Sequence, residues 1–128
     1  MESSAKYTAN TGVAEVSVAN AKLNGTGTVA TILTAASNGT LIKTVSIKSE
    51  VALDAGNIIR LFVYDEASTF LLKEILIRPT GGGAGSVFST FSTTIPLNFP
   101  LKSGYILKAS TELAKTTSII AEGLDWAY

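Results

Sequence analysis

The stretch that decides the fold covers residues 41–48 and reads Leu41-Ile42-Lys43-Thr44-Val45-Ser46-Ile47-Lys48. Successive side chains of an extended strand point to opposite faces, so this order places Val45 and Ile47 on one inner face. The polar side chains that alternate with them then lie on the outer face. The stretch therefore predicts a β-strand with one buried side.

Other stretches of strand length lie on both sides of it, separated by turn signals rich in Gly, Asn, Asp and Ser. They are Val13–Ala19, Thr28–Thr34, Ile58–Tyr64, Phe70–Ile77, Val87–Phe99, Tyr105–Ser110 and Ser118–Glu122. Short strands at regular spacing predict an all-β, single-domain antiparallel β-sandwich of about eight strands, which is jelly-roll-like. An immunoglobulin-like sandwich is the alternative, because the pattern does not reveal the strand order.

Two strand predictions carry further detail. Ile58–Tyr64 is apolar on both faces except at Arg60, which indicates a central strand. The longest stretch, Val87–Phe99, places five apolar side chains on one face, namely Val87, Phe91, Ile95, Leu97 and Phe99.

The domain is expected to span residues 13–128, with residues 1–12 as an extended N-terminal arm. These first residues are rich in Ser, Ala, Thr and Asn and lack apolar periodicity. An extended arm can reach a neighbouring subunit, and the alternative is a frayed terminus.

The composition excludes several classes of protein. Among 128 residues there is neither His nor Cys, so a Ser-His-Asp triad, a thiolate nucleophile and a disulfide framework are impossible within this chain. Ten Lys and Arg balance ten Asp and Glu, and the cations are scattered, which argues against nucleic-acid binding. No apolar run has the length of a membrane span and no secretory signal is visible. We expect a non-enzymatic protein without cofactor, membrane or nucleic-acid partner, and not secreted.

Three loops contain residue types that can bind an ion or a phosphate. Gly81–Gly85 is rich in glycine but is followed by a strand rather than by Lys and a helix, so we expect a plain loop. Asp54, Asp65 and Glu66 offer oxygen ligands without the spacing of a calcium site. We expect no metal there, and expect Asp65 to start a turn by accepting backbone hydrogen bonds.

Glu74 and Glu122 are candidate carboxylates for a glycosidase-like pair, which requires two carboxyl groups about 5–10 Å apart. The favoured interpretation is that they are solvated or ion-paired. The triplets Asn24-Gly25-Thr26 and Asn38-Gly39-Thr40 match the glycosylation pattern, but Asn-Gly is also a favoured hairpin turn. Without a secretory signal, we interpret both triplets as hairpin turns.

Large aromatic residues gather near the end of the sequence. Trp126 and Tyr128 are expected either to fold back onto the sandwich, to form a subunit interface, or to stack on a sugar ring together with Tyr64 and Tyr105. The residues predicted for an interface are Tyr7, Asp125, Trp126 and Tyr128.

From about Thr8 onward, the order and spacing of several stretches resemble a group of small β-sandwich structural proteins of tailed bacteriophage particles. The stretches are Asn24–Thr28, Asn38–Ile42, Arg60–Asp65, Leu72–Ile75, Gly104–Thr111 and Ala121–Asp125. No single stretch is specific, and the set taken together carries the resemblance.

The resemblance implies a non-enzymatic auxiliary or decoration protein of the phage head, or a small head-fibre or collar component. It brings no catalytic residues. The implied partners are the major capsid protein or other virion proteins, together with further copies of the chain. From the sandwich architecture alone, and not from the resemblance, we expect a trimer. The implied location is the virion, after synthesis in the cytoplasm of a bacterial host. The alternative function is a carbohydrate-binding module, or a small fibre or tail component, that recognises a surface glycan.

Overall fold

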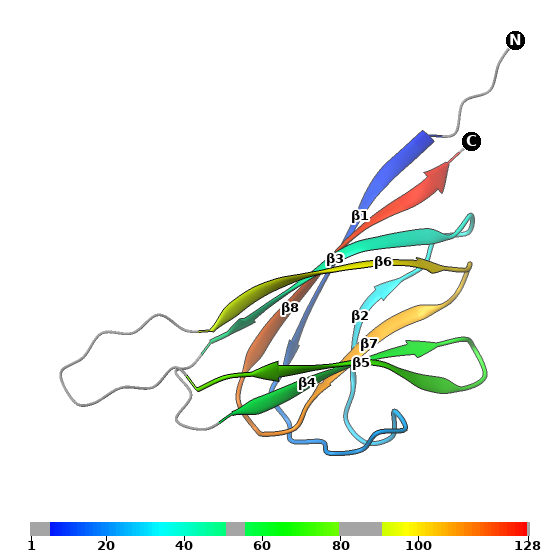
Figure 1. Cartoon of the computed structure of the whole chain (residues 1–128). Helices are drawn as coiled ribbons and strands as arrows, with labels where there is room; N and C mark the ends of the chain where they lie inside the picture. The colour runs from blue at the N-terminus through cyan, green and yellow to red at the C-terminus, as the bar shows by residue number, and fades with distance from the viewer. Residues whose placement is uncertain (1–5, 51–55, 80–90, 128) are drawn as a thin grey trace, which may run out of the picture.

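The computed structural model describes residues 6–50, 56–79 and 91–127, and these residues form a β-sandwich (Figure 1). The eight strands are β1 (Lys6–Val16), β2 (Ala30–Thr34), β3 (Thr40–Ser49), β4 (Asn57–Tyr64), β5 (Thr69–Ile77), β6 (Ser92–Leu101), β7 (Ile106–Thr111) and β8 (Thr117–Ala127). The described residues contain no helix long and apolar enough to cross a membrane. The predicted all-β sandwich is confirmed.

The strands form two antiparallel four-stranded sheets, with the orders β1-β8-β3-β6 and β2-β7-β4-β5. Only β4 and β5 are both consecutive in sequence and paired, and the other connections pass from one sheet to the other. An immunoglobulin domain instead places its first two strands side by side. The immunoglobulin-like alternative therefore does not match this strand order.

The core lies between the two sheets and is built by alternation along the strands. Val45 and Ile47 of β3 are buried as predicted, and β4 is a central strand between β7 and β5, also as predicted. The side chains that pack against them include Ile59, Leu61, Leu107, Ala109, Ile119 and Ala121.

β6 is an edge strand, so its inward residues are only partly covered. Phe91, Ile95, Leu97 and Phe99 are half-buried and alternate with exposed residues, as the sequence pattern predicts. The first residues of the predicted strand, 87–90, lie outside the described residues.

The strand β1 changes the predicted boundary of the N-terminal arm. Residues 6–12 are not separate from the sandwich, because they pair with β8 in an unbroken register from Lys6–Ala127 to Val16–Thr117. The N-terminal end of β1 projects beyond the rest of the sandwich (Figure 1), and its inner side carries the exposed Thr8 and the half-buried Asn10 in place of apolar residues. Residues 1–5 lie outside the described part of the chain.

The connection between β1 and β2 packs on the outer side of the β2-β7-β4-β5 sheet. Ala19 forms an isolated bridge with Thr111 of β7, and Gly25 lies against Thr69 at the start of β5. Gly25 has a φ of 79°, so the first Asn-Gly pair forms a tight bend. This bend lies in the connection from β1 to β2, which belong to different sheets, and it is therefore not a hairpin turn.

The second Asn-Gly pair, Asn38-Gly39, also turns the chain between the two sheets, from β2 to β3. Gly39 has a φ of 89° and donates a backbone hydrogen bond to Ala36. The turn predictions are therefore confirmed for both pairs, and the hairpin predictions are wrong. The strands on either side of each Asn-Gly pair do not form a hairpin, because each of them pairs with a strand that is distant in the sequence.

Candidate interaction surface at the β1–β8 end

The paired ends of β1 and β8 bring two aromatic side chains together. Tyr7 lies directly opposite Trp126 in the strand register, and their ring centroids are 4.6 Å apart at an interplanar angle of 50°. Tyr7 is 51% exposed, and Trp126 is half-buried. The backbone N–H of Trp126 donates to the carbonyl of Gly39 at 3.2 Å, which fixes the strand end. Trp126 therefore lies on an outer surface and is not part of the core.

The same outer face carries further apolar side chains. In the β1–β8 register, Ala9 lies opposite Leu124, next to the aromatic pair, and Val13 lies opposite Ile120, four residues further along each strand, with Thr11 and Glu122 between the two pairs. Val13 is 65% exposed and Ile120 is 38% exposed. We call the set Tyr7, Val13, Ile120, Leu124 and Trp126 the β1–β8 surface. Exposed apolar side chains on one face of a sheet, as at Tyr7, Val13 and Ile120, are typical of a contact with another macromolecule.

The inner side of the strand pair is polar, and its side chains are connected by hydrogen bonds. Oδ1 of Asp125 accepts hydrogen bonds from Nδ2 of Asn10 at 2.9 Å and from Oγ1 of Thr40 at 2.5 Å. Oγ1 of Thr40 in turn accepts a hydrogen bond from the backbone N–H of Ala36 at 3.0 Å. Asp125 thus holds three segments in place beneath the aromatic pair, and its predicted role as a direct contact residue remains a prediction.

An open depression adjoins the indole of Trp126. Its rim is formed by the β2–β3 turn and by the chain between β6 and β7. The lining residues are Ser37, Asn38, Gly39, Pro100, Leu101, Lys102, Ser103 and Trp126. Hydroxyl, amide and ammonium groups beside one exposed aromatic ring are chemically suited to a polyhydroxylated ligand.

The other predicted platform residues do not join Trp126. Tyr64 lies at the end of β4 in the other sheet, where Nζ of Lys108 is 4.7 Å from its ring centroid. Tyr105 is half-buried and packs against the core. A single sugar-stacking platform of Trp126, Tyr64 and Tyr105 is therefore not formed.

The predicted carboxylate candidates belong to different sheets. Glu74 is on β5, where its carboxylate lies 3.8 Å from Nε of the buried Arg60. Glu122 is on β8, and its Oε2 accepts a hydrogen bond from Oγ1 of Thr44 at 3.4 Å. Arg60 also forms an ion pair with Glu112. The structure therefore does not assemble Glu74 and Glu122 into a catalytic pair, and it confirms the ion-paired interpretation of Glu74.

The turn after β4 confirms the predicted role of Asp65. Its Oδ1 accepts backbone hydrogen bonds from Ser68 at 2.7 Å and from Ala67 at 3.0 Å. These hydrogen bonds stabilise the charged carboxylate and lower the pKa of Asp65 below its ordinary value. Within residues 6–50, 56–79 and 91–127, no cluster of three or more acidic, His or Cys side chains is arranged to hold a metal ion.

Three predicted features lie outside the described residues. They are Asp54, the loop Gly81–Gly85 and Tyr128.

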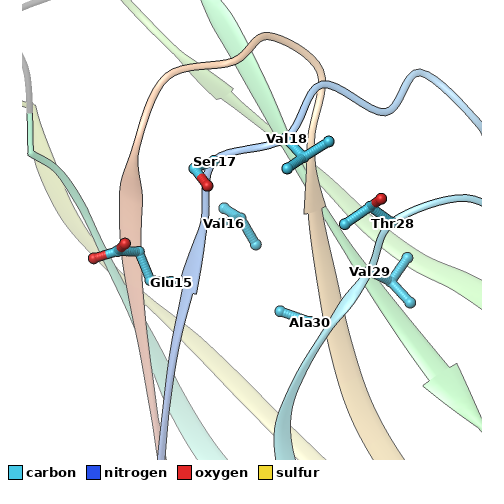
Figure 2. Close-up of a pocket in the computed structure, with 7 residues that line it drawn as sticks. All are labelled: Glu15, Val16, Ser17, Val18, Thr28, Val29 and Ala30. Atoms are coloured by element: carbon cyan, nitrogen blue, oxygen red, sulfur yellow. The ribbon is translucent and has the colours of Figure 1, made fainter.

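A small cavity lies between the end of β1 and the chain that enters β2 (Figure 2). Its volume is about 90 Å³, and it is lined by Glu15, Val16, Ser17, Val18, Thr28, Val29 and Ala30. Pockets for organic ligands are commonly about 300–1,000 Å³. The cavity is too small for such a ligand, and in Figure 2 the carboxylate of Glu15 points away from Val29 and Ala30.

The carboxylate of Glu15 has a different neighbour. The charge of Glu50, together with a hydrogen bond between the two side chains, raises the pKa of Glu15. Glu50 also accepts a hydrogen bond from Oγ of Ser118 at 2.5 Å. The result is a pair of neighbouring acidic groups at the end of β1 away from Tyr7.

Sequence reasoning identified Tyr7 and Trp126 but missed Val13, Ile120 and Asn10 as parts of this end of the molecule. The exposure of Val13 and Ile120 depends on the β1–β8 register, which pairs residues from the two ends of the chain. A signal was nevertheless present: in the pattern of Ser118–Glu122, Ile120 lies on the face opposite Ile119 and Ala121.

The fold and the surface define the chain as a two-sheet β-sandwich with an exposed aromatic and apolar surface on its terminal strands. No protein-family model matches the sequence, and no curated protein matches it. Among solved structures, the chain is similar to two crystal structures described as a pentameric capsid protein isolated from metagenomic phage sequences.

The first of these has a TM-score of 0.42 and 20% sequence identity over 88% of this chain and 60% of that chain. The second has a TM-score of 0.40 and 19% identity over 90% of this chain and 58% of that chain. This chain thus spans about 60% of the length of the first neighbour. Conclusions about function rest on the residues of this chain, because sequence identity at this level carries no residue roles.

Proposed function

We propose that this chain is a non-enzymatic structural protein of a tailed-phage particle, of the capsid decoration or auxiliary type. The observation that carries the proposal is the contact of the exposed Tyr7 with the half-buried Trp126 on the outer face of the terminal strands. Aromatic side chains are enriched at the centres of protein interfaces because they bury a large area at a low cost in conformational entropy. The resemblance found in the sequence supports the same class of role.

In this proposal the β1–β8 surface contacts the major capsid protein or another virion protein, and further copies of the chain assemble on the particle. Many identical copies make small contact surfaces effective, because binding at one site raises the local concentration for the next. The strand order, with connections that repeatedly cross between two four-stranded sheets, supports a jelly-roll description of the sandwich. The virion location and the synthesis in a bacterial cytoplasm belong to the same proposal.

The direct test is quantitative mass spectrometry of purified particles, which compares copies of this chain with copies of the major shell protein. A simple ratio that corresponds to hundreds of copies is expected for a decoration protein. A handful of copies would instead indicate a fibre, collar or tail component. Absence from the particle would overturn the proposal.

The contact surface is tested separately with particles that lack this protein. Trp126→Ala is expected to reduce rebinding strongly, because removal of an interface aromatic often costs about 2 kcal/mol or more. Tyr64→Ala, on the outer side of the other sheet, is the matched control and is expected to bind normally. Equal rebinding by both variants would exclude the β1–β8 surface as the contact.

A second candidate function is recognition of a surface glycan. It is favoured by the open depression in which Trp126 adjoins Ser37, Asn38 and Ser103. Binding of the purified chain to a panel of bacterial polysaccharides tests it. Binding that is lost in both Trp126→Ala and Asn38→Ala supports this candidate, whereas a chain that binds no polysaccharide but rebinds to particles excludes it.

A further inference from the structure

The outer edge of β1 has the properties of a strand that can pair with another chain. β1 is eleven residues long and pairs with β8 without a register shift. Within the described residues, no strand pairs with its other edge. An edge strand exposes a row of backbone N–H and C=O groups, and a long regular one is a template for a further strand.

The other three edges carry features that oppose such pairing. β6 contains Pro96 and Pro100, which lack an N–H, and Asn98 between them has a φ of 49°. β5 carries the charged pair Lys73 and Glu74, and its register with β4 shifts within the strand. β2 is five residues long and its register with β7 is also interrupted. Natural edges are commonly protected in these ways.

β1 has none of these protections along most of its length. Residues 7–14 contain neither a charged residue nor a proline. Tyr7 and Val13 are 51% and 65% exposed, and both lie on the outer face of the sheet. The chain has a formal net charge of zero, so long-range repulsion does not keep two copies apart.

We propose that two copies of this chain pair antiparallel along the outer edges of β1, about a two-fold axis that passes beside Asn10. Such an axis, normal to the sheet, keeps the outer faces of both copies on the same side. In this register, a residue that precedes Asn10 by a given number of positions in one copy lies opposite the residue that follows Asn10 by the same number in the other copy. Tyr7 of one copy then lies beside Val13 of the other, and the reverse pair forms as well.

This register joins apolar side chains that are already paired within each copy. Trp126 neighbours Tyr7 on β8, and Ile120 neighbours Val13. The joined sheet therefore carries two symmetric rows, each running Trp126, Tyr7, Val13, Ile120 across the boundary between copies. Cross-strand contacts of aromatic with β-branched side chains stabilise a sheet, and here they cover Tyr7 and Val13, the exposed large apolar residues of β1.

The shape of the molecule leaves room for this pairing. The ends of β1 and β8 project beyond the rest of the sandwich (Figure 1), and Thr8 on the inner side is exposed. The projecting end of one copy lies beside the half of β1 that is backed by β2 in the other copy. There, Gly12 approaches Ile32 from the inner side of the sheet and not along the edge.

The identity of the partner as a second copy follows from this symmetry. Tyr7 and Val13 are both exposed apolar residues on the same face of β1, so in an antiparallel pair of identical edges each copy supplies one half of the contact. This inference adds a self-association surface to the proposed function. Only the statement that the paired chains belong to a phage particle rests on that proposed function. The pairing itself is a property of the purified chain and is tested without particles.

The first test is the mass of the purified chain by analytical ultracentrifugation over about a hundredfold range of concentration. A concentration-dependent dimer is expected. Val13→Lys is expected to weaken the dimer by about tenfold or more, because it places a charge in the apolar row. Thr94→Lys, an exposed position on β6, is the matched control and is expected to leave the dimer unchanged.

The second test uses the absence of cysteine from the natural sequence. The proposed register places Ala9 of one copy directly opposite Thr11 of the other, within the Cα separation that a disulfide spans. The double variant Ala9→Cys/Thr11→Cys is therefore expected to form covalent dimers under mild oxidation. Ser92→Cys/Thr94→Cys on the outer face of β6 is the control and is expected to remain uncrosslinked.

A monomer at all concentrations, or a trimer, would overturn the two-fold pair, and so would a dimer that neither Val13→Lys nor the cysteine pair affects. Circular dichroism of each variant shows whether it is folded before its assembly is compared. The mass spectrometry of particles is independent of these measurements. A chain that pairs in solution but is absent from particles would retain the inference about pairing and overturn the proposed function.

Discussion

Nδ2 of Asn10 donates a hydrogen bond of 2.9 Å to Oδ1 of Asp125, and this contact joins the two ends of the chain. The two residues come from the neighbouring strands β1 and β8, on the inner side of the projecting strand pair. The rings of Tyr7 and Trp126, which contact each other at a tilt of 50°, lie on its other side. A polar network on one side thus holds the aromatic surface on the other in a defined orientation.

Asp125→Ala is expected to destabilise the protein by about 1–3 kcal/mol, because it removes the acceptor of two side-chain hydrogen bonds. The loss should be concentrated at the strand ends, so amide hydrogen exchange should accelerate most near Tyr7 and Trp126. Urea denaturation and hydrogen exchange measure the two effects. Asp125→Asn retains a carbonyl oxygen at the same position and should lose less stability, and equal losses in both variants would count against the network.

Gly12→Ala is expected to destabilise the protein by about 1–3 kcal/mol through steric overlap. An added methyl group would lie 2.1 Å from the carbonyl oxygen of Ile32, which belongs to the backbone of the opposing sheet and cannot rotate away. Thermal unfolding measures the effect. Gly56→Ala is the control, since its methyl group would lie 3.3 Å from the carbonyl oxygen of Ile77. A Gly12→Ala variant as stable as the natural protein would show that the sheets separate easily.

The parts of the fold that could be predicted are those with a sheet beneath them. In β3 and β7, residues such as Val45, Ile47 and Leu107 face the opposing sheet, so burial imposes a period-two pattern on the sequence. The first half of β1 has no such constraint, and Asn10 and Thr8 occupy its inner side. Strand pairing there is specified by β8, at the other end of the sequence, and no local pattern encodes it.

The candidate site was predictable in its composition but not in its arrangement. Trp126 is the single Trp of the chain, which made it a candidate without any structure. Its contact with Tyr7, and the separation of Glu74 from Glu122 into different sheets, both follow from strand order. Strand order is set by pairing between residues far apart in the sequence, which the alternation of side chains does not reveal.

Asp65→Asn is expected to lower the stability of the protein at neutral pH. It is also expected to make the decrease in stability at acidic pH smaller. The backbone N–H groups of Ser68 and Ala67 lower the pKa of Asp65 in the folded state, so its contribution is present above the pKa of the unfolded chain. That contribution is lost as the pH falls through the folded-state pKa. Urea denaturation between about pH 2 and pH 7 measures the change.

The control for this prediction is Asp65→Ala, which removes the hydrogen bonds as well as the charge. It should be less stable than Asp65→Asn at every pH, because an amide oxygen can still accept from the turn. If Asp65→Asn retained the full acid dependence of the natural protein, the turn carboxylate would not be its source.

Glu15→Gln is expected to have the opposite effect at neutral pH and to stabilise the protein. The charge of Glu50 raises the pKa of Glu15, so the folded chain binds a proton at this position more tightly than the unfolded chain does. The unfavourable contribution is therefore present at neutral pH and is relieved as the pH falls through the raised pKa. Glu15→Gln removes the repulsion at all pH values, so its advantage should shrink on acidification.

Urea denaturation of the natural protein and of Glu15→Gln, at neutral pH and at about pH 4, measures this advantage. Added salt gives an independent check, because it screens the repulsion between two exposed carboxylates and should bring the two stabilities together. Glu122→Gln is the matched control, since Glu122 lies on the same strand pair without an acidic neighbour in the described structure and should show no comparable gain. If Glu15→Gln had no stability advantage over the natural protein at neutral pH, or the same advantage at both pH values, Glu15 and Glu50 would not repel each other in solution.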